Sequence, residues 1–316
     1  MPAVYTHYIF TKEVYSKLKL STKNQIKNEL DLFEIFGKSF DILFFSDSKL
    51  GHLAHNFNTN LYFKNILLYI RKNNLQNDEK VLSYLYGSIC HYILDSICHP
   101  YVFYRTGKFN FRDKNSYKYK GLHNYYEYMI DSILYFNHNK RKMFQDKVYK
   151  LLFPKFCPNK SLKLLINYVI LNTFNSRFGY LKFRIGYLNF RLAFKYIMFS
   201  KVEYKKKIYS ILDKLNLFKN FNLSNLCYYI PELDYDVMNY GKKNWCNPVN
   251  DTLISNYSFD ELFSRAIKKA VQVIETVNSV LQNNQPLNVA LKVIGNFSYC
   301  SGSNLNLNLK MQYFDF

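Results

Sequence analysis

Three side chains that can bind metal lie four residues apart in one mainly apolar stretch of the sequence. The stretch is GSICHYILDSICHPYVFY, and it carries His91, Asp95 and His99. In an α-helix, residues spaced by four drift only about 40° around the axis, so these three groups share one face. A second pair with the same spacing, His123 and Glu127, follows in GLHNYYEYMIDS. Imidazole and carboxylate groups at this spacing reach one point, which is a common arrangement of zinc ligands.

A metal explains these groups better than ordinary packing does. A single histidine on an apolar face is more often a hydrogen-bonded core residue than a ligand. That explanation weakens when both helices are considered, because burying several imidazoles and carboxylates is costly unless they are paired. A shared metal compensates all of them together, and helix bundles build metal sites from such inward-facing side chains. We therefore predict a metal centre between helices.

Further candidate ligands lie upstream. All seven histidines fall within the first 138 residues of the chain. His7 lies in VYTHYIF, Asp41 in GKSFDILFF and His55 in LGHLAHNFNTNLYF. Asp41 and His55 are near predicted helix ends, where a turn can direct a side chain inward. Each could instead make hydrogen bonds in a loop, and His52 is an alternative to His55.

The elements that must position these groups are predicted to be helices. Most long segments repeat their apolar residues every 3.6 positions, whereas alternating strand patterns are scarce. The clearest helix covers residues 258–282, with Ser258 as N-cap and Glu261 as its capping-box partner. The other predicted helices cover residues 8–20, 23–36, 59–73, 78–98, 121–136, 141–152, 160–175 and 186–215. The predicted class is all-α, a multi-helix bundle.

Pro100 bears directly on the position of His99. A proline disfavours helical geometry at the residue before it. We therefore predict that the helix ends near His99 and turns this imidazole away from His91 and Asp95, towards a different metal.

The second half of the chain has fewer markers. Residues 243–256 are predicted to form a surface loop anchored by Trp245 and Pro248, and the Asn-rich end is predicted to be an extended tail. No sharp boundary is evident, so we expect one helical domain over residues 1–316. Its metal-site half would be residues 1–140 and its helical remainder residues 141–316.

Composition and charge favour anionic partners. The chain has 316 residues and a net charge of +20, with lysine and arginine spread along its whole length. Such a charge attracts lipid headgroups or nucleic acid, although the codon bias of an AT-rich genome would give a similar composition. The N-terminus shows no signal-peptide pattern, and no stretch reaches the roughly 18 consecutive apolar residues that span a bilayer. We expect a cytoplasmic protein.

The motifs together resemble those of the zinc-dependent phospholipase C family. They are TH near the N-terminus, an isolated Asp, HNFNTN, the H-x-x-x-D of HYILDSICHPY and a later H-x-x-x-E. The resemblance is closer to an uncharacterised Firmicute branch, and the wider fold includes fungal zinc-dependent single-strand nucleases. It implies a helical fold with a zinc cluster between helices.

The resemblance also implies a set of ligands for two or three zinc ions. Asp41, His55, His91 and Asp95 would hold the first, His99, His123 and Glu127 the second, and His7 with a bridging Asp95 the third. The gap from Asp95 to His99 is shorter than in the characterised enzymes. Those enzymes also use an N-terminal Trp at the third zinc. This chain lacks that Trp, and the amine of Pro2 is a candidate substitute.

The implied activity is phosphodiester hydrolysis by metal-bound hydroxide, most similar to that of phospholipase C. Asp41 would bind metal and also orient or deprotonate the attacking water. The substrate would be a phosphoester such as a phospholipid, with peripheral membrane contact. A zinc nuclease or other phosphoesterase of the same fold is one alternative. A non-catalytic, metal-stabilised helical module that binds anionic membrane or nucleic acid is another. The sequence gives no indication of oligomeric state.

Two sets of supporting residues are also candidates. Zinc-bound imidazoles usually donate their second ring N–H to an acceptor, for which Asp131 and Asn58 are suggested here. Aromatic residues near the predicted centre could form a choline-binding cage or a base-stacking pocket, or could simply be packing residues. These are Tyr5, Tyr8, Tyr92, Tyr101 and Tyr126.

Overall fold

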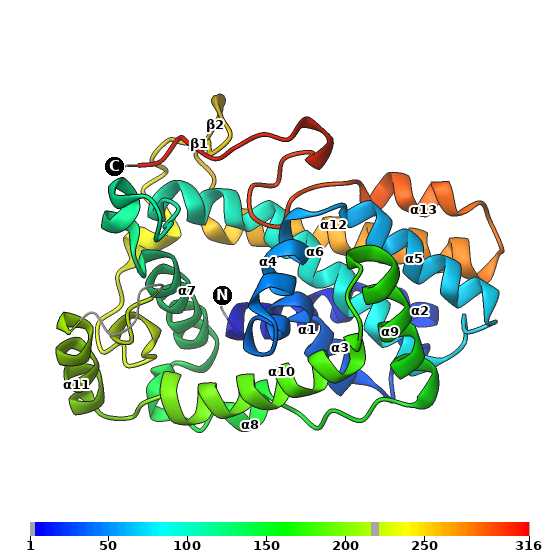
Figure 1. Cartoon of the computed structure of the whole chain (residues 1–316), viewed down its shortest axis with the longest axis horizontal. Coiled ribbons are helices and arrows are strands. Elements are labelled where there is room, and N and C mark those ends of the chain that lie inside the picture. The colour runs from blue at the N-terminus through cyan, green and yellow to red at the C-terminus, as the bar shows by residue number, and fades with distance from the viewer. Residues whose placement is uncertain (1–3, 216–220, 316) are drawn as a thin grey trace.

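The molecule is built mainly of helices, and the predicted all-α class is confirmed (Figure 1). The computed structural model describes residues 4–215 and 221–315. The α-helices are α1 (Val4–Lys17), α2 (Leu20–Asn24), α3 (Leu30–Phe36), α4 (Ser48–Asn56), α5 (Thr59–Lys72), α6 (Glu79–Thr106), α7 (Leu122–Asn139), α8 (Tyr149–Leu152), α9 (Lys160–Phe174), α10 (Gly179–Ala193), α11 (Glu203–Lys214), α12 (Phe259–Gln282) and α13 (Leu287–Ile294). A 3₁₀ helix, η1 (Ser39–Phe45), joins α3 to α4, and a π-helical turn, η4 (Phe194–Met198), follows α10. Strands β1 (Trp245–Asn247) and β2 (Asn250–Ser255) form an antiparallel hairpin.

Helix α6 is the central element of the fold. It contacts α1, α3, α7 and α12, and Figure 1 shows it running through the middle of the molecule. Nearly all side chains from Val81 to Cys98 are buried. Buried apolar side chains from Val4 to Tyr299 form one connected core cluster around it. The polar groups of α6 therefore lie inside the bundle and need partners there.

Three predicted helices are confirmed to within one residue at each end, namely α5, α9 and α12. Each combines a continuous amphipathic pattern with an N-cap side chain that accepts a hydrogen bond from a backbone N–H of the first turn. The N-cap residues are Asn58, Asn159 and Ser258. Ser258 and Glu261 form the predicted capping box.

Other boundaries were predicted wrongly. The helix expected over residues 186–215 is divided into α10, η4 and α11, with an extended backbone at Phe199 and Val202. The apolar pattern continues across this break, so periodicity could not show it. The helix expected over 23–36 is interrupted between α2 and α3, and the helix expected over 141–152 is reduced to a 3₁₀ turn at Met143–Gln145 and the four-residue α8. Helices α4 and α13 were not predicted.

The predicted end of α6 near His99 is also wrong, because the helix continues through Pro100 to Thr106. Proline has no N–H to donate to the carbonyl of Ser96, four residues earlier. The backbone of Gly302 packs against this carbonyl: a Cβ atom there would lie 2.2 Å from the Ser96 oxygen. Gly302 also has a φ of +61°, which favours glycine. A distant loop thus covers the place where the proline interrupts the helix.

We expect Gly302→Ala to lower the free energy of unfolding by about 3 kcal/mol, through overpacking and a left-handed backbone together. Urea unfolding followed by circular dichroism measures this change. Gly241→Ala is the matched control, because a Cβ there meets nothing within 4 Å. Equal stability of the two variants would contradict the packing described.

The segment predicted as a surface loop over 243–256 contains the β1–β2 hairpin. Trp245 anchors it as expected, with its side chain buried and its indole N–H donating to the carbonyl of Tyr257 at 3.1 Å. The carbonyl of Pro248 accepts hydrogen bonds from the backbone N–H groups of Gln312 and Tyr313, so the Asn-rich end is held against the hairpin. Within the described ranges, no helix has the length and apolar character needed to cross a membrane.

Candidate metal centre

The structure brings all eight candidate ligands into the interior of the bundle. They come from α1 (His7), η1 (Asp41), α4 (His55), α6 (His91, Asp95, His99) and α7 (His123, Glu127). All are buried except His99 and His123, which are partly exposed.

The first group consists of His7, Asp41, His91 and Asp95, whose potential ligand atoms all lie within 4.8 Å of one another. His91 Nδ1 is 3.4 Å from Asp41 Oδ2, and His7 Nε2 is 3.3 Å from Asp95 Oδ1. His55 lies beside the group, with Nε2 3.1 Å from Asp41 Oδ1. Two ligand atoms on a tetrahedral zinc, each about 2.1 Å from the ion, are themselves about 3.4 Å apart. The spacing therefore suits atoms that share one ion.

The second group consists of His99, His123 and Glu127. Glu127 Oε1 lies 3.0 Å from His99 Nε2 and 3.2 Å from His123 Nε2. Asp95 lies between the groups, because its Oδ2 atom is 3.6 Å from His99 Nδ1 and 3.5 Å from His91 Nε2. His99 thus reaches the second group even though the helix does not end before Pro100.

Several atoms at the centre are buried and have no hydrogen-bond partner among the described residues, which is costly for ionisable groups. They are His7 Nδ1, Asp41 Oδ2, both ring nitrogens of His91, Asp95 Oδ2 and Glu127 Oε2. A bound cation would satisfy carboxylate oxygens and imidazole nitrogens together, and this donor set is one that zinc prefers. The residues present therefore fit zinc.

Backbone carbonyls fix the orientation of two imidazoles. His55 Nδ1 is 2.8 Å from the carbonyl oxygen of Gly51, and His99 Nδ1 is 2.9 Å from that of Tyr299. A carbonyl only accepts, so in each neutral ring the proton sits on Nδ1 and the lone pair on Nε2 faces the group of candidate ligands. Tyr299 was missed by sequence reasoning, since a backbone carbonyl 200 residues away leaves no sequence signal.

The acceptors suggested from the sequence do not have that role. Asp131 instead accepts from the backbone N–H groups of Tyr5 and Thr6 at 2.9 and 2.7 Å, and from the hydroxyl of Tyr228. It holds the start of α1, which carries His7 one residue later. Burial raises the pKa of Asp131 to about 6. Asn58 serves as the N-cap of α5.

Electrostatics at the centre keep the carboxylates of Asp95 and Glu127 charged. Burial raises the pKa of Asp95, but the surrounding imidazoles outweigh it and lower the pKa below its ordinary value. Glu127 behaves in the same way next to His123. Burial lowers the pKa of His91 to about 4, whereas Asp95 and Glu127 outweigh burial at His99 and raise its pKa to about 9. Without metal, the centre therefore draws in a proton at His99.

A fully buried lysine lies three residues before Asp41. Lys38 donates to the carbonyl of Glu34 at 2.9 Å, and burial lowers its pKa to about 8. The ordinary pKa of lysine is near 10.5. Keeping the buried ammonium group charged therefore lowers the unfolding free energy by on the order of 3 kcal/mol below pH 8, and this destabilisation disappears as pH rises towards 10.5.

We expect Lys38→Met to raise the unfolding free energy by about 1–3 kcal/mol at pH 7 and by less at pH 10. Urea unfolding at both pH values measures this, and the exposed Lys268→Met is the control. A gain that does not shrink with pH would contradict the assignment.

The five tyrosines suggested for a cage or stacking pocket are core residues, all buried. The hydroxyls of Tyr101 and Tyr126 bond to each other at 2.8 Å, and Tyr92 donates to the carbonyl of Ile294. They therefore do not form a choline cage. His52 is exposed, with its ring next to that of Phe44, and belongs to neither group.

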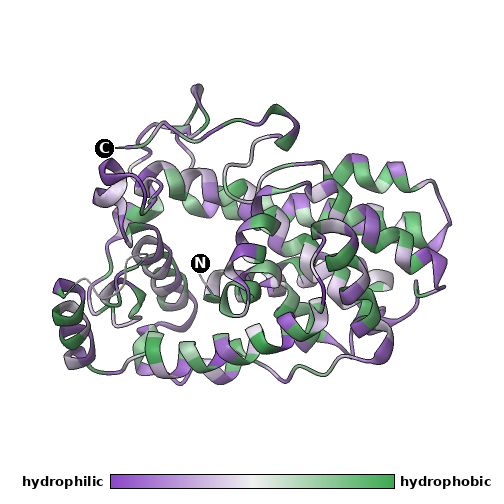
Figure 2. Ribbon diagram, in the orientation of Figure 1, coloured by the Kyte–Doolittle hydropathy of each residue, from purple (hydrophilic) through white to green (hydrophobic). Residues whose placement is uncertain are grey.

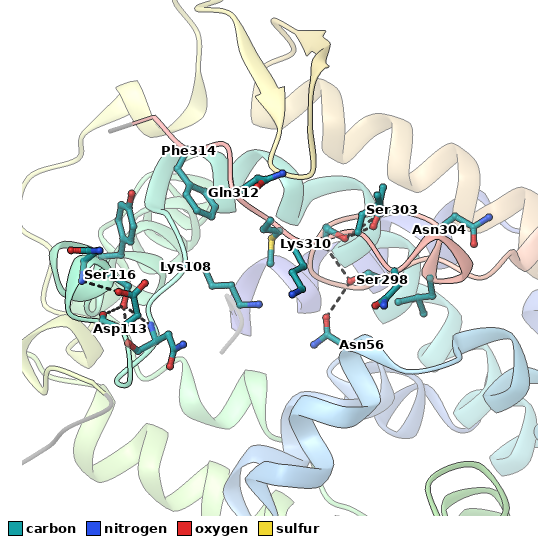
Figure 3. Close-up of a pocket in the computed structure, with 18 of the residues that line it drawn as sticks. Asn56, Lys108, Asp113, Ser116, Ser298, Ser303, Asn304, Lys310, Gln312 and Phe314 are labelled. Atoms are coloured by element: carbon teal, nitrogen blue, oxygen red, sulfur yellow. Dashed lines mark hydrogen bonds between the residues drawn. The ribbon is translucent and has the colours of Figure 1, made fainter.

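A polar cleft of about 1010 Å³ lies next to the centre (Figure 3). Ser298 and Ser301 line the cleft, whereas the ring of Tyr299 between them packs against the centre, with its centroid 5.3 Å from those of His55 and His91. One segment of backbone thus separates the cleft from the candidate ligands. Figure 3 shows the side chains of Lys108 and Lys310 projecting into this space. Neither forms an ion pair with a described residue.

Comparison with known proteins identifies a family. A family model described as zinc dependent phospholipase C matches residues 6–180, more than half of the chain. This range includes all eight candidate ligands and ends well before Tyr299. No curated protein and no solved structure matches the chain.

Proposed function

Because the chain belongs to the zinc-dependent phospholipase C family, we propose that it hydrolyses phosphodiesters, with phospholipids as the substrate class. The observation that carries the proposal is the pair of buried His and carboxylate groups joined by Asp95, with their unpartnered ligand atoms. Bound zinc would supply an activated water near neutral pH and neutralise charge on phosphoryl oxygens.

The proposed ligands follow the two groups. Asp41, His91 and Asp95 would hold one ion with His55 at its side, and His99, His123 and Glu127 would hold another. A third ion at His7 and Asp95 would need a further ligand. The Pro2 amine considered from the sequence lies outside the described residues. We therefore propose at least two zinc ions.

Asp41 is the proposed catalytic residue. Its Oδ1 atom lies 3.1 Å from His55 Nε2, whereas its buried Oδ2 atom has no hydrogen-bond partner among the described residues. Oδ2 can therefore accept the proton of an attacking water or fix its direction. Lys108 and Lys310 in the neighbouring cleft would attract the anionic phosphoester and hold it beside the centre.

The decisive experiment measures both the metal content and the turnover of the purified chain. Elemental analysis of the purified chain should find at least two zinc ions per molecule, and the chain should hydrolyse bis(p-nitrophenyl) phosphate. Asp41→Asn should lower this turnover by about a hundredfold or more while the circular dichroism spectrum is unchanged. The exposed Asp251→Asn is the matched control and should keep full activity.

The substrate class is tested on phosphatidylcholine, phosphatidylglycerol and single-stranded DNA in parallel. Cleavage of the DNA alone would identify a nuclease of the same fold. A metal-free protein would overturn the proposal. So would a chain that loses helicity on chelation and turns over none of the substrates, because this is the behaviour of a structural metal module.

A further inference from the structure

Helix α10 exposes large apolar side chains along its outer face. Leu181, Ile185, Leu188 and Leu192 are each between 42% and 52% exposed. Phe178, the residue before the helix, is 70% exposed. Isolated exposed apolar residues are ordinary, but a continuous row on one helix marks an interaction site. Figures 1 and 2 show α10 at the lower edge of the molecule, with apolar and polar residues alternating along it.

The row is narrow and lies opposite the buried face of α10. At 100° per residue, the four side chains within the helix fall inside an arc of about 60°. Phe183, Tyr187 and Phe190 are buried and project from the other side. The helix is therefore apolar on two faces, only one of which is covered.

Exposed arginines line one side of the apolar row. Arg184 and Arg191 are exposed and project next to it, within about 100° of its centre. Between Lys147 and Val202 the sequence has eleven lysines and arginines and no aspartate or glutamate. The following helix, α11, has no buried side chain and exposes Tyr204, Ile208 and Ile211.

We propose that the exposed face of α10 docks on the surface of an anionic phospholipid bilayer. An apolar row flanked by arginine and lysine is the pattern of a helix that lies in the membrane interface. The charge disfavours pairing with a second copy of this chain, because two such basic faces repel. Nucleic acid would not cover a row of leucine and isoleucine.

The docking face is fixed to an element of the metal centre. Helix α10 packs on η1, which carries Asp41. Gly186 allows this close approach, since a Cβ there would lie 2.3 Å from the carbonyl oxygen of Ile42, and Asn189 donates to the carbonyl of Phe45 at 2.9 Å. The inference deepens the proposed phospholipase-like function and rests on it for its purpose: docking through α10 would keep the chain at the surface that carries its lipid substrate.

The test is sedimentation of the full chain with vesicles of phosphatidylcholine containing 30% phosphatidylglycerol. We expect binding that falls by tenfold or more in Leu188→Gln/Leu192→Gln. Arg184→Gln/Arg191→Gln should also weaken binding and reduce its dependence on anionic lipid and on salt. The matched controls, Leu253→Gln/Ile254→Gln on β2 and Lys268→Gln/Lys292→Gln, should bind as the parent chain does.

Turnover of soluble bis(p-nitrophenyl) phosphate, measured on the same variants, separates this inference from the proposed function. All variants should keep the parent's turnover of this substrate. Vesicle binding that the α10 changes leave intact would overturn the docking face, whatever the turnover. Binding through α10 in a chain without any turnover would support the face and overturn the hydrolase. The parent chain could instead be recovered as a stable dimer that the Leu188→Gln/Leu192→Gln changes dissociate. That result would identify a second copy as the occupant and overturn the membrane proposal.

Discussion

Asp95→Asn should lower phosphodiester hydrolysis by about a thousandfold, equivalent to about 4 kcal/mol of transition-state stabilisation. Asp95 is the carboxylate that lies within 4 Å of four imidazoles, those of His7, His55, His91 and His99. Asparagine keeps its shape but removes the charge and one ligand oxygen. Both groups of candidate ligands lose a member, so zinc content should fall by at least one ion per chain. Steady-state turnover and elemental analysis measure the two effects.

Asp78→Asn is the control on the same helix. Asp78 is the N-cap of α6 and accepts from the backbone N–H groups of Lys80 and Val81. Asparagine also caps helices well, so activity should stay near that of the parent, even though the hydrogen bond from Asn159 to the second carboxylate oxygen is lost. Near-normal turnover of Asp95→Asn with a full complement of zinc would contradict the central position given to Asp95.

Removal of zinc by a chelator should lower the melting temperature by on the order of 10 °C. Zinc present at a thousand times its Kd stabilises the folded chain by about 4 kcal/mol. Without it, Asp41, Asp95 and Glu127 are left buried with unpartnered oxygen atoms. Thermal unfolding followed by circular dichroism, with and without chelator, measures the difference. An unchanged melting temperature would show that the centre holds no tightly bound ion.

Zinc should also rebind more weakly as pH falls. The pKa of His99 in the metal-free chain is raised to about 9, so below pH 9 this imidazole carries a proton that zinc must displace. Each unit of pH below 9 should therefore weaken binding about tenfold for this one proton. Zinc titrations at pH 6.5 and 7.5 test the slope. His138→Gln, which removes a histidine outside both groups, should leave it unchanged.

Sequence reasoning succeeded where local chemistry decides the structure. The boundaries of α5, α9 and α12 followed from an uninterrupted amphipathic pattern and a polar N-cap. It failed where distant packing decides. The proline rule predicted a stop before Pro100, but Gly302 covers the affected carbonyl and the helix continues. The break between α10 and α11 was hidden because the apolar pattern runs across it.

Prediction of the candidate site succeeded and failed for the same two reasons. The spacing of His91 with Asp95, and of His123 with Glu127, pointed to side chains that meet, because helix geometry alone fixes that relation. The position of His7 against His91, with ring centroids 4.9 Å apart, depends on how α1 packs on α6 and has no local signal. The carbonyl of Tyr299 and the lysines of the cleft likewise could not be predicted from the sequence, because they lie on loops whose positions depend on the packing of the whole chain.

The role of Tyr299 has a consequence for the order of events during protein synthesis. Its N–H donates to the carbonyl of His55, and its own carbonyl meets His99. Every candidate ligand has been translated by residue 127, yet the carbonyl that orients the imidazole of His99 is made more than 170 residues later. The chain emerging from the ribosome therefore carries all eight candidate ligands before the orienting carbonyl of Tyr299 has been made. Alignment of His99 in the second group has to wait until the segment around Tyr299 has been made and folds back against α4 and α6.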